Sequence, residues 1–345
     1  DLCCGLCRVE EICLSAEKRE WGDMSGSKNQ FDSSTFGPSI LMKNSGGHTM
    51  ATKHIIFVPG KNPKPEAAQH RELLWRTLVE GVRRADSETA DTLQAGYSQF
   101  HLISWNYLYY HQYKDVTMDI PWIDALINKH GPTEQDIREI NSWNIRLQRI
   151  MLTLGDHVPF LIRLLPEKTR STANEISRYF NNTDHVASEI RRLLTQALRP
   201  MLERQEEILL IGHSLGSVIA YDTLWELSRQ ERVKGKVDFL TLGSPLGMHY
   251  VQRRLLGMSG VKSYPDRIRR WINLSAEGDV AALNRNLNKS FHPMLERGLV
   301  ESIEDHSHGI YNFYSSDEGL NCHRSYGYLV NPAVGSIIAD WWKHR

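Results

Sequence analysis

Short apolar runs and amphipathic segments alternate along the chain from residue 54 onward. The runs are short, apolar and rich in Ile, Leu, Val and Phe, as strands buried in a parallel sheet should be. Predicted strands cover residues 54–58, 100–105, 208–211, 237–242 and 268–274, with a last strand near residues 309–315. Residues 66–84 and 186–204 place their apolar side chains on one helical face. The pattern predicts an α/β fold, with a mostly parallel central sheet flanked by helices.

The stretch from about residue 114 to residue 185 departs from this alternation. Apolar side chains recur there at helical spacing from Trp122 to Leu154, without a strand-like run between them. Pro121, Pro132, Pro159 and Pro166 divide the stretch into pieces. We therefore expect a helical cap insertion on top of the sheet.

The first 49 residues read differently from the rest. Residues 22–49 are rich in Gly, Ser, Asn, Asp and Thr and show little periodicity. This composition predicts an appended or disordered extension over residues 1–49, followed by a single α/β domain over residues 50–345. Four cysteines fall in the extension, at a spacing that matches no closed four-ligand zinc pattern, so we predict no metal. The fifth, Cys322, has no partner within the domain, which favours a reducing, cytoplasmic compartment.

The charge balance narrows the classes of partner. Lys plus Arg and Asp plus Glu each number 41, which gives a formal net charge of zero. That balance does not favour nucleic acid as a partner. No run approaches the roughly 18 apolar residues that span a bilayer, so we expect no transmembrane segment and leave peripheral membrane contact open.

The hexapeptide GHSLGS at residues 212–217 carries the clearest chemistry. It matches G-x-S-x-G, follows the predicted strand 208–211 and precedes an apolar helical pattern. A nucleophile elbow needs this strand–turn–helix context, because the sharp turn presents the serine hydroxyl. A phosphate-binding turn is the alternative, but neither G-x-G-x-x-G nor a Walker loop is present. The motif predicts that Ser214 is a nucleophile.

A serine nucleophile needs a base, and the base needs an acid that orients it. The chain order in this kind of site is Ser, then Asp or Glu, then His. Asp279 follows a predicted strand, where the chemistry of parallel sheets gathers, and is the first candidate for the acid. Glu277 is its close rival, and Asp279 could alternatively cap a helix over 280–283. Asp266, Asp305 and Asp317 fit less well, because Asp266 precedes its strand and the other two follow uncertain elements.

Four later histidines compete for the role of base. His323 lies in a polar loop ahead of the final apolar segment, 44 residues after Asp279, and fits best. His306 and His308 belong to a stretch that looks solvated, and His292 completes the set. His213 is too close to Ser214 in sequence to act as its base, and we expect it to pack beside the elbow.

An acyl-transfer site also needs donors for the oxyanion of its tetrahedral intermediate. The backbone N–H of Leu215, directly after the nucleophile, is one predicted donor. The other should come from the loop after an early strand, and the sequence Val-Pro-Gly-Lys at residues 58–61 fits that place. We assign it to the N–H of Lys61.

Five motifs together resemble the α/β-hydrolase superfamily, on its lipase and esterase side. They are VPG at 58–60, GHSLGS at 212–217, TLGSPL at 241–246, NLSAEGDVAAL at 273–283 and HRSYGYL at 323–329. The resemblance covers about residues 52–342 and implies a Ser214–His323–Asp279 triad without a cofactor. GHSLGSVIAYD at 212–222 is also similar to the elbow of intracellular phospholipases of the DDHD type. The chain lacks the DDHD residues themselves and has PG where many lipases have HG.

These observations predict a serine hydrolase that cleaves carboxylic esters through an acyl-enzyme on Ser214. Its partner would be a small-molecule or lipid ester. A thioesterase, an amidase or an acyltransferase on the same fold is an alternative, as is a non-catalytic binding protein that retains the elbow.

Overall fold

The computed structural model describes residues 52–157, 175–258, 260 and 263–344. Six strands in this part of the chain form one sheet, in the order β2-β1-β3-β4-β5-β6. The strands are β1 (Lys53–Val58), β2 (Phe100–Leu102), β3 (Glu207–His213), β4 (Val237–Leu242), β5 (Ile268–Leu274) and β6 (Ser302–His306). Every pairing is parallel, which confirms the predicted parallel sheet.

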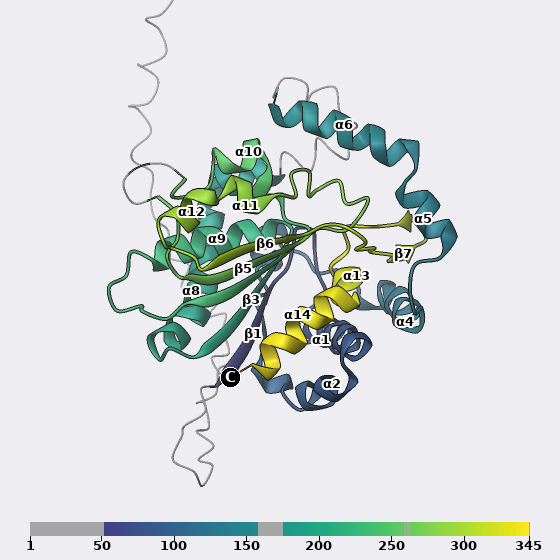
Figure 1. Ribbon diagram of the computed structural model, residues 1–345, viewed down its shortest axis with the longest axis horizontal. Helices are drawn as coiled ribbons and strands as arrows, with labels where there is room; N and C mark the ends of the chain where they lie inside the picture. The colour runs from purple at the N-terminus through teal and green to yellow at the C-terminus, as the bar shows by residue number, and fades with distance from the viewer. Residues whose placement is uncertain (1–51, 158–174, 259, 261–262, 345) are drawn as a thin grey trace, which may run out of the picture. The chain divides into compact units, whose positions relative to one another are not determined.

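Helices cover both faces of the sheet (Figure 1). On one face, α1 (Ala67–Ala85) lies beside α14 (Pro332–Lys343). On the other face, α8 (Val186–Glu203) packs against α9 (Leu215–Leu227). The predicted helices at 66–84 and 186–204 are thus confirmed as α1 and α8. The arrangement is an α/β fold with two helical layers around a parallel sheet.

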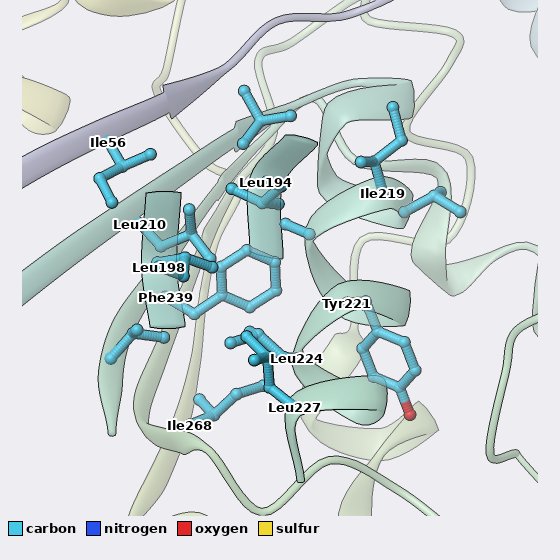
Figure 2. Close-up of a cluster of buried hydrophobic side chains, with 14 of the residues drawn as sticks. Ile56, Leu194, Leu198, Leu210, Ile219, Tyr221, Leu224, Leu227, Phe239 and Ile268 are labelled. Carbon is cyan, nitrogen blue, oxygen red and sulfur yellow. The ribbon is translucent and has the colours of Figure 1, made fainter. Parts of the chain in front are cut away.

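The strands supply two cores because alternate residues point to opposite faces. Ile55 and Phe57 of β1 pack under α1 and α14, whereas Ile56 and Val58 face α8 and α9. Figure 2 shows the second core, with strand side chains meeting leucines of α8 and α9. The labelled residues there are Ile56, Leu194, Leu198, Leu210, Ile219, Tyr221, Leu224, Leu227, Phe239 and Ile268.

Two strand predictions need correction. The last strand of the six-stranded sheet is β6 at Ser302–His306, not a segment near residues 309–315. It is an edge strand with one buried apolar side chain, Ile303, so it lacks the apolar run that marks the inner strands. The apolar residues Ile310 and Phe313 are buried from an irregular loop instead. Strand β2 is also shorter than predicted and ends at Leu102.

The stretch predicted as a cap insertion is helical in its described parts. It contains η3 (Val116–Met118), α4 (Ile120–Asn128), α5 (Glu134–Ile140), α6 (Trp143–His157), a helix over 175–180 and η5 (Thr183–His185). Pro121 starts α4 rather than breaking it. Ile123 and Leu126 of α4 are buried in the α1 and α14 core, so this helix belongs to the body of the domain. The role of the remaining helices as a cap stays a prediction.

Shorter elements complete the connections. They are α2 (Ser87–Gln94), η2 (Tyr97–Gln99), α3 (Asn106–Tyr110), η6 (Pro245–Gly247), α10 (His249–Gln252), α11 (Leu287–Ser290), α12 (His292–Glu296), β7 (Ser315–Ser316), β8 (Gly319–Leu320) and α13 (Ser325–Leu329). None of the helices that the structure describes is both long and apolar enough to cross a membrane. The predicted extension over residues 1–49 lies outside the described residues.

Candidate active site

Ser214 lies at the turn between β3 and α9, as the motif predicts. Its backbone has φ 53° and ψ −127°, a strained conformation for a residue other than glycine. The turn is held because the Ser214 N–H donates to the Leu242 carbonyl of β4 at 3.0 Å. It also depends on Gly216, where a Cβ would collide with the carbonyl of Val58 at the end of β1. Neighbouring strands therefore fix the serine at the carboxyl edge of the sheet.

The three predicted side chains meet in one hydrogen-bonded chain. His323 Nε2 lies 2.8 Å from Ser214 Oγ, and His323 Nδ1 lies 2.9 Å from Asp279 Oδ2. The three come from separate loops: Ser214 follows β3, Asp279 follows β5, and His323 lies between β8 and α13. Residues far apart in sequence thus converge at one edge of the sheet.

Asp279 is buried, yet its surroundings favour a carboxylate. Tyr328 Oη donates to Asp279 Oδ2 at 2.6 Å, and the Ala281 N–H donates to Oδ1 at 2.9 Å. Burial by itself would raise the pKa of Asp279, but His323, Tyr328 and Ala281 together hold this pKa below its usual value. An ionised Asp279 only accepts hydrogen bonds, so His323 Nδ1 carries the proton and Nε2 is left to accept from Ser214.

His213 packs beside the elbow, as predicted, and supports His323 through the backbone. Its Nε2–H donates to the His323 carbonyl at 2.8 Å, and the two rings lie 4.9 Å apart. Burial, together with the nearby His323 and Lys64, lowers the pKa of His213 well below its usual value. The His213 ring is therefore neutral at pH 7 and does not compete for the proton of Ser214.

The rival acids have other partners. Glu277 pairs with Arg285 at 3.3 Å, and Asp305 accepts from Asn273 and from the N–H groups at the start of α11. Asp279 does accept the Ala281 N–H, but no helix forms over residues 280–283.

The rival histidines are solvent-exposed. His292 lies near Glu296, and His306 lies near Glu304. His308 is exposed as well. Among the described residues His323 Nε2 is the histidine nitrogen that bonds Ser214 Oγ, and no such bond joins the serine to His292, His306 or His308.

The predicted oxyanion donors belong to the two segments that adjoin Ser214, the start of α9 and the loop after β1. Leu215 is the first residue of α9. Its N–H therefore has no carbonyl from a preceding helical turn to which it can donate. The loop after β1 presses on the elbow at Gly60, where a Cβ would lie 2.9 Å from Ser214 Cβ. The N–H of Lys61 has no acceptor among the described residues, while its ammonium lies 3.3 Å from Glu175. The assignment of these two N–H groups as oxyanion donors stays a prediction.

Two other features bear on the chemistry. No three His, Cys, Asp or Glu side chains within the described ranges are placed to share a metal ion. Cys322 precedes His323, but burial raises the pKa of its thiol to about 12, so it is not a thiolate at neutral pH. Ser214 is thus the hydroxyl that lies within hydrogen-bond distance of His323, at 2.8 Å, and its role as a nucleophile stays a prediction.

A cavity of about 740 Å³ lies elsewhere, between α14 and the face formed by β4, β5 and β6. Its lining includes Asp238, Arg270 and His306, and none of the three residues of the hydrogen-bonded chain. Its size alone does not make it the reaction site.

Sequence reasoning missed two residues next to this site. Tyr328 belongs to the motif HRSYGYL, but nothing in the spacing shows that its hydroxyl reaches Asp279. Asn106 bonds the loop after β1 and stands in no motif of its own.

Comparison with models of known protein families, with curated proteins and with solved structures finds no match for this chain.

Proposed function

We propose that this protein is a serine hydrolase of the α/β-hydrolase type that cleaves carboxylic esters. The observation that carries the proposal is the Ser214–His323–Asp279 chain, with hydrogen bonds of 2.8 and 2.9 Å, built on a strained strand–turn–helix. Nucleophile, base and orienting acid in mutual contact are the requirements for covalent acyl transfer. The motif order along the sequence supports the same function.

In this mechanism Ser214 Oγ attacks the ester carbonyl while His323 Nε2 accepts the hydroxyl proton. Asp279 holds the ring in the required tautomer and stabilises the imidazolium that forms. The N–H groups of Lys61 and Leu215 stabilise the oxyanion. Collapse of the intermediate expels the alcohol, which takes the proton from His323, and leaves an acyl group on Ser214. Water activated by the same histidine then releases the acid.

A fluorophosphonate probe tests the nucleophile directly, because it reacts only with an activated serine. We expect stoichiometric labelling of the wild-type protein and peptide mapping of the adduct to Ser214. Ser214→Ala is the matched variant and should remain unlabelled. Failure of the folded wild-type protein to label, beside a serine hydrolase that does, would rule the proposal out.

The leaving group is the next question, since thioesters and amides are attacked by the same chemistry. A panel of acyl esters, thioesters and amides that share one acyl group separates these activities by kcat/KM. We expect the esters to react fastest. A preference for thioesters or amides would keep the nucleophile and change the substrate class. Faster transfer to an added alcohol than to water would indicate an acyltransferase.

A further inference from the structure

The loop after β1, residues 59–62, is bonded by the start of α3. Trp105 Nε1–H donates to the Pro59 carbonyl at 2.8 Å. Asn106 Nδ2 donates to two carbonyls, those of Gly60 and Asn62, at 2.9 Å each. Both donors are buried, with 0% of Trp105 and 2% of Asn106 exposed. Three of the four loop carbonyls are therefore held by two adjacent side chains.

These bonds determine where the N–H groups of the loop point. In a trans peptide the carbonyl oxygen and the following N–H lie on opposite sides. Because the Pro59 and Gly60 carbonyls are turned toward α3, the N–H groups of Gly60 and Lys61 are turned away from it. Neither N–H has an acceptor among the described residues. Consecutive N–H groups turned the same way can bind an anion, and Gly60 lies against Ser214.

Asn106 has a second feature that stability alone does not explain. Its Oδ1 is buried and has no hydrogen-bond partner among the described residues. The orientation of the amide follows from its neighbours, because only the NH2 end can bond two carbonyls. A buried acceptor left without a partner is unfavourable, and an apolar residue would avoid that loss. Asn106 is therefore a polar side chain with one unpaired buried oxygen, and both of its side-chain hydrogen bonds go to the loop after β1.

We infer that Trp105 and Asn106 are positioning residues for the oxyanion loop, residues 59–62. The inference rests on the proposed hydrolase function and adds two residues to it. Neither side chain contacts the reacting atoms. They hold the peptide planes so that the Lys61 N–H faces the oxygen that becomes charged in the transition state. Their loss should affect the transition state more than substrate binding.

Two variants test this role, Asn106→Ala and Trp105→Phe. The second keeps an aromatic ring but removes the donor to Pro59 together with part of a buried indole, so its folding is checked by a thermal melt. Tyr107→Ala is the control from the same helix, since Tyr107 is 43% exposed and stacks on Tyr113, away from the loop. We expect kcat to fall about 10- to 100-fold in Asn106→Ala, somewhat less in Trp105→Phe, with KM little changed. Fluorophosphonate labelling should slow in parallel, and the control should match wild type.

The outcomes separate this inference from the proposed function. A wild-type protein that neither labels nor hydrolyses any ester would overturn both. Normal kcat in folded Asn106→Ala, or a rise in KM at constant kcat, would overturn the positioning role and leave the hydrolase intact. If Trp105→Phe fails to fold, its bond serves stability, and that too counts against the inference.

Discussion

At the scale of single residues, the site depends on which nitrogen of His323 carries the proton. Asp279 settles this because it is buried, ionised and bonded at both oxygens. The neutral His213 and the unreactive Cys322 thiol leave one base and one nucleophile. The proposed chemistry therefore depends on three side chains: Ser214 as nucleophile, His323 as base and Asp279 as the acid that orients the base.

Replacing His323 with alanine tests the base. Without the imidazole, Ser214 keeps its proton, and we expect kcat/KM for the best ester to fall by at least about 10³-fold. The fold should survive, because His323 is at the surface of the site and its side chain is 29% exposed. His306→Ala is the matched control and should keep full activity. Steady-state kinetics and a thermal melt measure both effects, and near-normal turnover would assign the base elsewhere.

The sequence predicts the contacting trio but not the residues that support it. Ser214, Asp279 and His323 each follow a recognisable pattern: a motif, the end of a strand, and a late polar loop. Tyr328 and Asn106 are ordinary members of helical segments, and their bonds arise from how distant segments pack. Side-chain bonds between elements carry no periodicity, so single-sequence reasoning has no signal for them.

At the scale of elements, the inner strands are predictable and the edge strand is not. Strands β1, β3, β4 and β5 have apolar residues on both faces because helices cover both sides. Strand β6 reads Ser-Ile-Glu-Asp-His, and only its backbone pairing with β5 makes it a strand. The loop after it buries apolar residues without sheet pairing, which explains why the prediction fell there.

The contact between α9 and β1 explains the second glycine of the elbow. A Cβ on Gly216 would collide with the carbonyls of Val58 and Pro59, so α9 would have to move away. We expect Gly216→Ala to lower the free energy of unfolding by about 1–3 kcal/mol and to slow fluorophosphonate labelling. Gly131→Ala is the control, because nothing lies within 4 Å of its added Cβ. Urea unfolding and labelling kinetics check both, and equal stability of the two variants would contradict the argument.

Helix α9 also carries a buried acid outside the site, Asp222. Its oxygens accept from Tyr179 Oη at 3.1 Å and from the Leu256 N–H at 2.9 Å. Burial raises the pKa of Asp222 to about 7, against about 3.8 in the unfolded chain. The folded state therefore binds the proton more tightly. The contribution of Asp222 to stability is complete below about pH 4 and is lost as the pH rises to about 7.

Asp222→Asn tests this dependence. The amide is neutral at all pH values and can keep both bonds, accepting from Leu256 and donating to Tyr179. We expect the free energy of unfolding of the variant to rise relative to that of wild type as the pH rises from 4 to 8. The difference between the two proteins should be smallest at pH 4. Urea unfolding at several pH values measures this gap, and Asp91→Asn, at an exposed site, is the control. A gap that narrows with rising pH would reverse the assignment.

At the scale of the whole molecule, the two ends of the parallel sheet differ: one carries the proposed active site and the other carries contacts that stabilise the fold. The carboxyl ends of the strands hold Ser214 and Asp279 in strained or buried positions. Near the amino end, Asp238 of β4 joins the sheet to the last helix. It accepts from Trp341 Nε1 of α14 at 2.9 Å and pairs with Arg269 and Arg270 of β5. The stabilising contacts of Asp238 are thus separated from the proposed active site at the other end of the sheet.

This separation predicts that Asp238→Ala lowers stability and spares the chemistry. The change leaves the buried Trp341 N–H without an acceptor and removes the partner of two arginines. We expect a loss of about 2–3 kcal/mol, less than for a fully buried pair because the arginine side chains are 41% and 42% exposed. Burial alone would raise the pKa of Asp238, but Arg269 and Arg270 hold this pKa below its usual value. Its contribution is therefore present above about pH 4 and is lost as the pH falls.

The comparison is therefore made at pH 7 and repeated at low pH, where wild type and Asp238→Ala should converge. Asp124→Ala, which breaks an exposed pair with Arg76, is the control and should cost less than about 1 kcal/mol. Labelling of Ser214 under native conditions should be as fast in Asp238→Ala as in wild type. Slower labelling at full occupancy of the folded state would show that the two ends of the sheet are coupled, because a carboxylate on β4 would then influence a serine that it does not contact.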